Sequence, residues 1–344
     1  MGSDGLFKLA SLPRHLRAAL TDVEHASPAV RRSAVRDLAR FGVEPERDAA
    51  IGALQKALRD VDADVRADAV LALSDLGAEG ALPELLRLLG DVHLRVRQMA
   101  LLGLGELASS EDGEVLGRIG SFLNAGEPAL RFQALAAWAR LVPERLLEVV
   151  LERMRDSDPE VRALSLRLAE ERWAESPSEL PSDLEVALRN RLGDDAPEVR
   201  LLAAVLLARK GLSTDALALL GAVERRLGVR EPADEQIAIE LCGVLGLHEA
   251  TRALRRRAFG LFGWSRDPFC WHARVALARM GDPRAVQVIL DGLRARAWHT
   301  RAVAADSAGR AGLVQALPRL EELRSDPRLD PELLETAIAA LRDR

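Results

Sequence analysis

The chain has 344 residues, more than one compact core usually holds, and its net charge is −5. Hydrophobic residues make up 48% and aromatic residues only 3%, with no tyrosine, which favours helices over a β-sandwich or barrel. The acidic balance excludes a protein that coats nucleic acid with its whole surface, and two cysteines exclude a disulfide framework or a structural zinc site.

The start of the chain gives no sign of membrane insertion or export. No stretch reaches the roughly 18 consecutive apolar residues of a membrane span. Lys8, Arg14, His15 and Arg17 interrupt any apolar segment that a signal peptide would need. We therefore expect a cytoplasmic protein.

One short phrase recurs along the chain. It combines a turn residue, an apolar residue, an arginine and a small residue three places after the arginine, as in residues 27–34 and 196–203. The small residue recurs at Ala34, Ala69, Ala100, Ala134, Ser165, Ala203, Ala238, Ala273, Ala304 and Ala337. The spacing averages about 34 residues, so about ten repeats cover the chain.

Each repeat is expected to form two helices. The first carries an apolar run such as residues 82–89, and a turn with Asp, Ser or Pro follows. We number each second helix from the residue four places before the small one, as position 0; apolar residues at positions 0, 4, 7, 8 and 11 then form one helical stripe. Glycines are expected to end second helices as left-handed caps at Gly42, Gly77, Gly211, Gly246, Gly281 and Gly312.

The longest irregular stretch is Arg172 to Asp183, which contains Ser-Pro-Ser and Leu-Pro-Ser. It is either a hinge between repeats one to five and six to ten or a long surface loop. We expect residues 1–344 to form a single solenoid with a possible hinge at 172–183.

The turn residues and the Val-Arg pair resemble the HEAT repeat, in the short bacterial form also seen in phycobilin-lyase-like proteins. This resemblance implies an all-α superhelix of the HEAT/armadillo type. It also implies a structural role for the arginine at position 1, which in HEAT proteins interacts with turn carboxylates. The arginine is present as Arg31, Arg66, Arg97, Arg131, Arg162, Arg200 and Arg301. The pattern departs at Glu235, Cys270 and Leu334.

In HEAT-like folds the second helices line the concave side. Position 9 carries Ala, Gly or Ser in eight of ten repeats, and positions 2 and 6 carry many apolar residues. One interpretation is a groove for an apolar or amphipathic segment of a partner. The other is close packing between neighbouring second helices. The predicted contact residues are Phe132, Leu201, Val205, Trp271 and Val275.

Charge is uneven along the chain. Residues 251–310 hold 12 arginines and four aspartates, interleaved with aromatic residues such as Trp264 and Trp271, whereas residues 61–250 are acidic overall. This basic segment could hold an acidic partner, phosphates or only solvent, and self-association with an acidic region is also possible. Its candidate residues are Arg252, Arg255, Arg256, Arg257 and Arg301.

Little in the sequence indicates catalysis, a metal or a cofactor. His248-Glu249 is a single pair, whereas HEAT-like di-iron hydroxylases need several, and Cys270 with His272 gives too few ligands for zinc. HEAT-like DNA glycosylases use Trp, Asp and Arg, for which Trp271, Asp306 and Arg301 would be the candidates. Nothing points to bilin chemistry.

We therefore predict a non-enzymatic scaffold or adaptor whose concave surface holds an apolar or amphipathic segment of a protein partner. The basic segment would favour a partner that is also acidic. The alternative is a nucleic-acid-binding protein, similar to the HEAT-like glycosylases, that uses the Arg/Trp-rich segment 251–301. A lyase-type enzyme is the third possibility.

Overall fold

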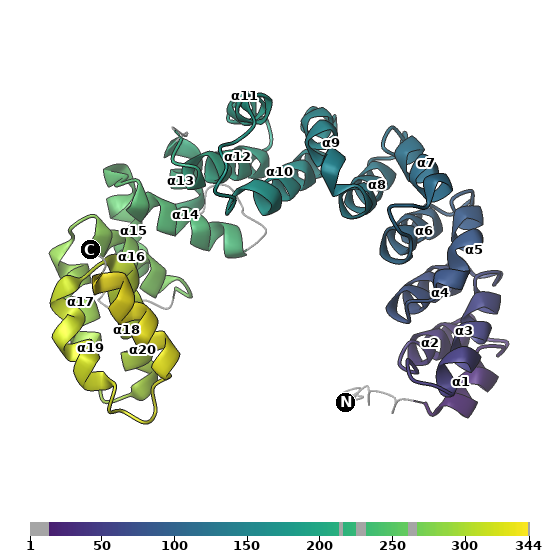
Figure 1. Ribbon diagram of the computed structural model, residues 1–344, viewed down its shortest axis with the longest axis horizontal. Coiled ribbons are helices and arrows are strands. Elements are labelled where there is room, and N and C mark those ends of the chain that lie inside the picture. Colours follow the sequence, from purple (N-terminus) through teal and green to yellow (C-terminus); the bar gives the residue numbers. More distant parts are fainter. Residues whose placement is uncertain (1–13, 213–215, 225–231, 261–266, 343–344) are drawn as a thin grey trace, which may run out of the picture. The chain divides into compact units, whose positions relative to one another are not determined.

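A computed structural model describes residues 14–212, 216–224, 232–260 and 267–342. In these ranges the chain consists of helices and their connections, without a β-strand. It forms two compact units, residues 1–165 and 166–344, whose boundary lies inside α10 (Pro159–Trp173). The helices follow one another in pairs (Figure 1), which confirms the expected all-α repeat fold. The single solenoid with a hinge at 172–183 stays a prediction.

Unit 1 is built from first helices that pack on a row of second helices. The second helices α2, α4, α6 and α8 contact one another in that order, and α1, α3, α5 and α7 each contact the second helix that follows. The helices are α1 (Leu16–Asp22), α2 (Pro28–Leu38), α3 (Glu46–Ala57), α4 (Ala63–Asp75), α5 (Leu82–Leu88), α6 (Leu94–Leu107), α7 (Gly113–Phe122), α8 (Pro128–Leu141), α9 (Leu146–Arg153) and the start of α10, with 3-10 turns η1 (Glu79–Ala81) and η2 (Pro143–Arg145).

Unit 2 repeats this arrangement. Its second helices α12, α14, α16, α18 and α20 contact one another in order, and each packs against the first helix before it. After the end of α10 the helices are α11 (Ser182–Arg191), α12 (Pro197–Arg209), α13 (Ala216–Val223), α14 (Pro232–Val244), α15 (Thr251–Phe259), α16 (Cys270–Arg279), α17 (Pro283–Gly292), α18 (Trp298–Ala311), α19 (Leu317–Leu323) and α20 (Pro331–Arg342), with 3-10 turns η3 (His248–Ala250) and η4 (Val314–Ala316).

The helix ends follow the predicted chemistry at Asp62 and at five of the six glycines. The Asp62 carboxylate accepts hydrogen bonds from the backbone N–H groups of Asp64 and Val65 at the start of α4. Of the six predicted glycine caps, five have positive φ: Gly77, Gly211, Gly246, Gly281 and Gly312. The prediction for Gly42 is wrong, because α2 already ends at Leu38.

The arginines at position 1 connect the turns between repeats. The Arg66 guanidinium donates to the carbonyls of Asp60 and Val61 in its own turn, and to the Asp91 carboxylate of the next turn at 2.9 and 3.0 Å. Arg31 and Arg131 make the same two kinds of bond. This confirms at these positions the structural role that the HEAT resemblance implies.

The departures from this arginine pattern are compensated locally. Glu235 forms an ion pair with the buried Arg257 of α15 at 2.7 Å. Cys270 replaces the arginine of repeat eight, and Ala295 stands where the acceptor aspartate of the next turn would be. Losing both partners together leaves no uncompensated charge, which costs far less than losing one.

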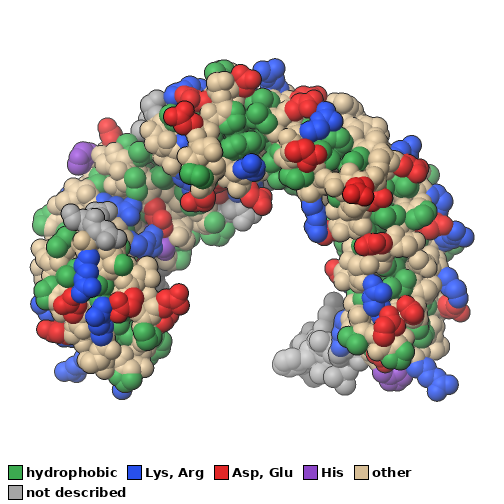
Figure 2. All heavy atoms as spheres, viewed as in Figure 1, with side chains coloured by type: hydrophobic (Ala, Val, Ile, Leu, Met, Phe, Trp, Pro, Cys, Tyr) green, Lys and Arg blue, Asp and Glu red, His purple; other side chains and the backbone are tan. Residues whose placement is uncertain are grey.

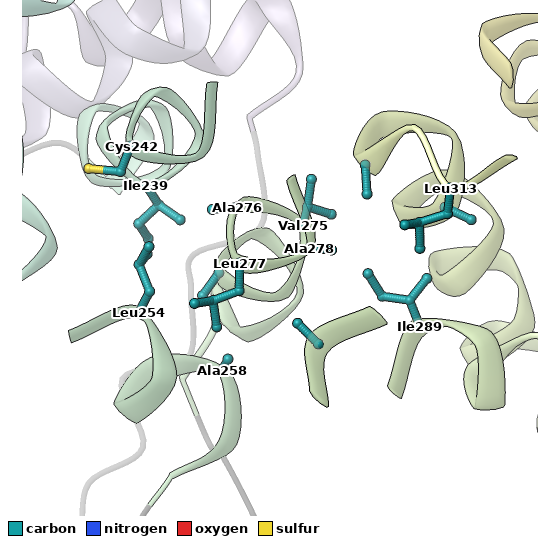
Figure 3. Close-up of a cluster of buried hydrophobic side chains, with 14 of the residues drawn as sticks. Ile239, Cys242, Leu254, Ala258, Val275, Ala276, Leu277, Ala278, Ile289 and Leu313 are labelled. Atoms are coloured by element: carbon teal, nitrogen blue, oxygen red, sulfur yellow. The ribbon is translucent and has the colours of Figure 1, made fainter. Parts of the chain in front are cut away.

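The small residues at position 9 let neighbouring second helices approach closely. A Cβ atom added to Gly105 would lie 2.9 Å from Cα of Ala137, and one added to Gly243 would lie 2.5 Å from Cα of Ala276. These contacts support the packing interpretation of the small-residue line. Around them, Ile239, Leu254 and Leu277 from α14, α15 and α16 belong to one buried cluster of unit 2 (Figure 3).

Candidate binding surface

Positions 2, 6 and 10 of the second helices face away from the buried stripe, because they lie on the opposite side of a 3.6-residue helix. In unit 1 this face carries partly exposed apolar residues on three successive helices. We call them the apolar strip: Leu71 on α4, Leu102 on α6, and Phe132 and Ala136 on α8. Figure 2 shows hydrophobic side chains interspersed with charged ones over the visible surface.

Charged residues border the apolar strip. Arg140 on α8 forms an ion pair with Glu106 on α6, and both side chains are largely exposed. Arg95 on α6 lies 3.3 Å from Asp64 on α4. A narrow apolar centre with an exposed polar border has the composition of a protein–protein contact patch.

At the α2 end of this face, the Asp68 carboxylate forms ion pairs with three arginines. The Asp68 side chain is only 4% exposed and lies 2.7 Å from both Arg32 Nε and Arg36 Nε, with Arg95 at 3.4 Å. Burial alone would raise the pKa of Asp68, but the hydrogen bonds from Arg32 and Arg36 outweigh it and lower the pKa. The cluster ties α2, α4 and α6 together.

In unit 2 ion pairs extend across the second helices. Arg167 on α10 lies 2.8 Å from the buried Asp234 carboxylate on α14 and 3.0 Å from Glu198 on α12. Burial disfavours the charged guanidinium, yet the bonds to Asp234 and Glu198 raise the pKa of Arg167 overall. This first cross-helix ion pair therefore connects three successive second helices.

A second cross-helix ion pair joins α14 to α18. The Glu240 carboxylate lies 2.5 Å from Arg310 on α18 and 2.9 Å from Nδ1 of His272 on α16. Burial would raise the pKa of Glu240, but hydrogen bonds with His272, Arg310 and Gln236 hold the pKa at about 2. The carboxylate is therefore ionised at every physiological pH.

Three of the predicted partner contacts are in the core. Leu201, Val205 and Val275 are 0%, 2% and 1% exposed. On α12 nine of the 13 residues are buried, because α11, α13 and α14 contact the helix. The prediction that these three residues contact a partner is therefore wrong; their apolar character serves burial.

The two aromatic candidates remain partly exposed. Phe132 belongs to the apolar strip of unit 1. Trp271 packs against the core of unit 2, where its ring would be 3.2 Å from a Cβ added to Gly292. The Arg274 guanidinium lies 4.5 Å from the centre of the same ring.

The predicted basic patch is largely used inside the fold. Arg257 is 6% exposed and bonds to Glu235 and Asp267, and Arg301 bonds to the carbonyls of its own turn and to Asp326, so their prediction as surface contacts is wrong. Arg255 is exposed but pairs with Asp282 at 2.7 Å.

Arg252 and Arg256 are exposed and line a cavity of about 540 Å³ beside Val223 and Asp267. Trp264 and Arg266 lie outside the described residues.

The side chains of Cys242 and His272, which could take part in catalysis or bind a metal, are respectively buried and held by a partner in the fold. Burial raises the pKa of the Cys242 thiol to about 12, so it stays protonated. His272 is held by Glu240. Within the ranges that the structure describes, no three His, Cys, Asp or Glu side chains form a group that could hold a metal ion. In the same ranges, no helix is both long and apolar enough to cross a membrane.

The fold and its repeated turns define an all-α repeat protein, and comparison with protein families identifies the repeat. Residues 13–105 match the family of HEAT repeats, and the helix pairs continue beyond them to residue 342. Residues 13–105 are therefore identified as HEAT repeats. A search of curated proteins found no match.

Similar folds occur among solved structures. YibA of Escherichia coli is 16% identical, with a TM-score of 0.45, over 93% of this chain and 98% of its own. A chain of the CpcE–CpcF complex of phycocyanin lyase from Nostoc sp. PCC7120 is 16% identical, with a TM-score of 0.42; the match covers 84% of this chain and 97% of that chain. A chain in a structure of Kap95p with RanGDP is 15% identical, with a TM-score of 0.49; the match covers 95% of this chain and 50% of that chain.

The sequence interpretation missed the cross-helix ion pairs. Arg167 and Glu240 both occupy position 6, where unit 1 carries Arg36 on α2 and then Leu71, Leu102 and Ala136. The alternation of charged and apolar residues at this repeat position was the feature of the sequence that could have indicated the ion pairs. The pairing itself depends on contacts between residues about 70 positions apart, which the repeat spacing alone does not define.

Proposed function

We propose that this protein is a non-catalytic scaffold that binds a protein partner on the second-helix face of unit 1. The apolar strip of Leu71, Leu102, Phe132 and Ala136 would bury against an apolar or amphipathic segment, and the charged border would set its orientation. Repeat solenoids present extended surfaces of this kind.

The observation that carries the proposal is the difference between equivalent positions of the two units. Position 6 is apolar and partly exposed in three successive repeats of unit 1. In unit 2 Val205 and Val275 at the same position are buried, charged residues alternate with them, and the exposed apolar residue is Ala339 in the last repeat. Exposed apolar side chains without an internal role favour an external partner.

The nucleic-acid alternative has weaker support. Arg255, Arg257 and Arg301 have carboxylate partners within the fold, which lowers the positive charge available to phosphates. Arg252 and Arg256 are the residues on which this alternative now depends.

The test is affinity capture from lysate of the source cells with the full chain as bait, with and without nuclease. We expect one dominant protein that remains after nuclease and at moderate salt. Recovery of nucleic acid, lost after nuclease or at moderate salt, would instead support the alternative. Recovery of neither would contradict the scaffold proposal.

A further inference from the structure

One repeat carries a charged residue at a position that is otherwise part of the core. Position 5 of the second helix faces the first helices and is 0–1% exposed in nine of the ten repeats. These residues are Val35, Val70, Leu101, Leu135, Leu166, Ala204, Ile239, Ala305 and Ile338. In repeat eight the same position is Arg274, on α16. The flanking positions, Ala273 and Leu277, stay fully buried, so the register is unchanged.

Arg274 has neutral contacts in place of a counter-ion. Its Nε donates to the carbonyl of Ala258 at 3.1 Å, and its guanidinium stacks on Trp271 at 4.5 Å. It has no carboxylate partner among the described residues, and the segment 261–266 contains no acidic residue. Burial lowers the pKa of Arg274, because desolvation disfavours the charged form. A partly buried guanidinium in this state costs stability that an aliphatic side chain would not.

A second arginine reaches the same end of α15. The guanidinium of Arg284, on α17, lies 4.1 Å from the ring centre of Phe259, the residue after Ala258. Arg284 is exposed and also lacks a carboxylate partner within the described parts of the chain. Two guanidinium groups, each beside an aromatic ring, therefore lie near the C-terminal end of α15, and neither has a carboxylate partner among the residues that the structure describes.

We propose that Arg274, assisted by Arg284, binds a side-chain carboxylate of an acidic segment in the protein partner. The inference rests on the proposed scaffold function and adds the chemistry of the partner. A guanidinium matches a carboxylate with two parallel hydrogen bonds, and a stacked ring holds it in that orientation. The ring of Trp271 also offers an apolar surface to the methylene groups of Asp or Glu. The excess of arginine in residues 251–310 attracts an acidic chain to this region.

The first experiment measures thermal unfolding of the full chain with increasing succinate, against chloride at the same ionic strength. Succinate should raise the melting temperature of the wild type in proportion to the logarithm of its concentration. Arg274→Leu places at position 5 the leucine that repeats three and four carry there, as Leu101 and Leu135. This variant should melt at or above the wild-type temperature, and succinate should no longer raise its melting temperature. Arg294→Leu removes an exposed arginine of the same segment and should keep the response.

Equal responses of the wild type and Arg274→Leu, or no response in either, would overturn the carboxylate site. A lower melting temperature of Arg274→Leu, restored by Arg274→Lys, would assign Arg274 to the Ala258 carbonyl instead. A parallel titration with phosphate shows whether the site prefers phosphate or carboxylate. If phosphate raises the melting temperature more than succinate does, the ligand is not an acidic protein segment.

The second experiment is partner capture. Arg274→Leu should reduce capture about tenfold, as expected for the loss of one charge-assisted bidentate contact. Undiminished capture by Arg274→Leu refutes this inference and leaves the scaffold proposal intact. Failure of the wild type to capture any protein refutes the scaffold proposal, whereas the succinate titration still decides whether Arg274 binds carboxylates.

Discussion

The second-helix faces of the two units differ although they share one repeat pattern. In unit 1, position 6 presents Leu71, Leu102 and Ala136, which are partly exposed. In unit 2, Glu240 at this position bonds to an arginine on another second helix, and the neighbouring Val275 is buried. The same helical position therefore presents apolar side chains on three successive helices of unit 1, whereas in unit 2 it alternates between buried valines and charged residues.

This difference shows that an apolar residue at a repeat position has no fixed meaning. Val205 and Val275 are apolar because neighbouring side chains cover them, whereas Leu102 is apolar and still accessible. The charge at the alternating positions decides between the two cases. A repeat protein can thereby reserve part of its length for a partner and stabilise the rest internally.

The largest expected effect comes from breaking an ion pair of unit 2. Arg167→Ala leaves the Asp234 carboxylate, 6% exposed, without its main partner and should lower the free energy of unfolding by about 3 kcal/mol. In unit 1, Arg140→Ala breaks the exposed pair with Glu106 and should cost about 0.5 kcal/mol or less. Urea unfolding measures both, and equal costs would contradict the distinction between the two faces.

The second cross-helix pair should make unit 2 sensitive to acid. The folded pKa of Glu240, about 2, lies below the ordinary value of 4.5, so its contribution is complete above pH 4.5 and disappears as pH falls toward 2. Glu240→Gln should therefore destabilise by about 2 kcal/mol near neutral pH, with the difference from wild type shrinking through this range. A difference that stays constant between pH 6 and pH 2 would rule out this role for the Glu240 charge.

An effect of similar size is expected from the close contacts between second helices at position 9, which both units share. Gly243→Ala forces a Cβ to 2.5 Å from Cα of Ala276 and should cost about 1–3 kcal/mol. Gly117→Ala on α7 meets no atom within 4 Å and should be neutral or stabilising by up to about 1 kcal/mol. Melting temperatures report both changes. If Gly243→Ala were as stable as Gly117→Ala, the position 9 line would not serve close packing.

The sequence predicted the repeats and their turns well, because these depend on local patterns. The anchors from Ala34 to Ala337 and the bonds of Arg66 follow from spacing and turn chemistry. Accessibility was not predictable for Leu201 or Val275, because it depends on which helices and side chains cover them. Gly42 was misassigned because helix length within a repeat varies.

Arg274 shows the opposite case. A comparison of position 5 across the repeats would have identified it, since Arg274 is the one charged residue at that position. Its neutral surroundings, the Ala258 carbonyl and the Trp271 ring, become visible in the structure alone.

The most direct measurement is partner capture by two variants that place the same charge at position 6 in each unit. Ala136→Glu introduces a carboxylate into the apolar strip, and Ala339→Glu introduces it on α20, where the side chain is exposed. Arg167 at position 6 of the next repeat shows that the register tolerates a charge. Both variants should keep the wild-type melting temperature. Our account predicts that Ala136→Glu loses the partner while Ala339→Glu retains it. Equal capture by both variants, or loss confined to Ala339→Glu, would contradict it.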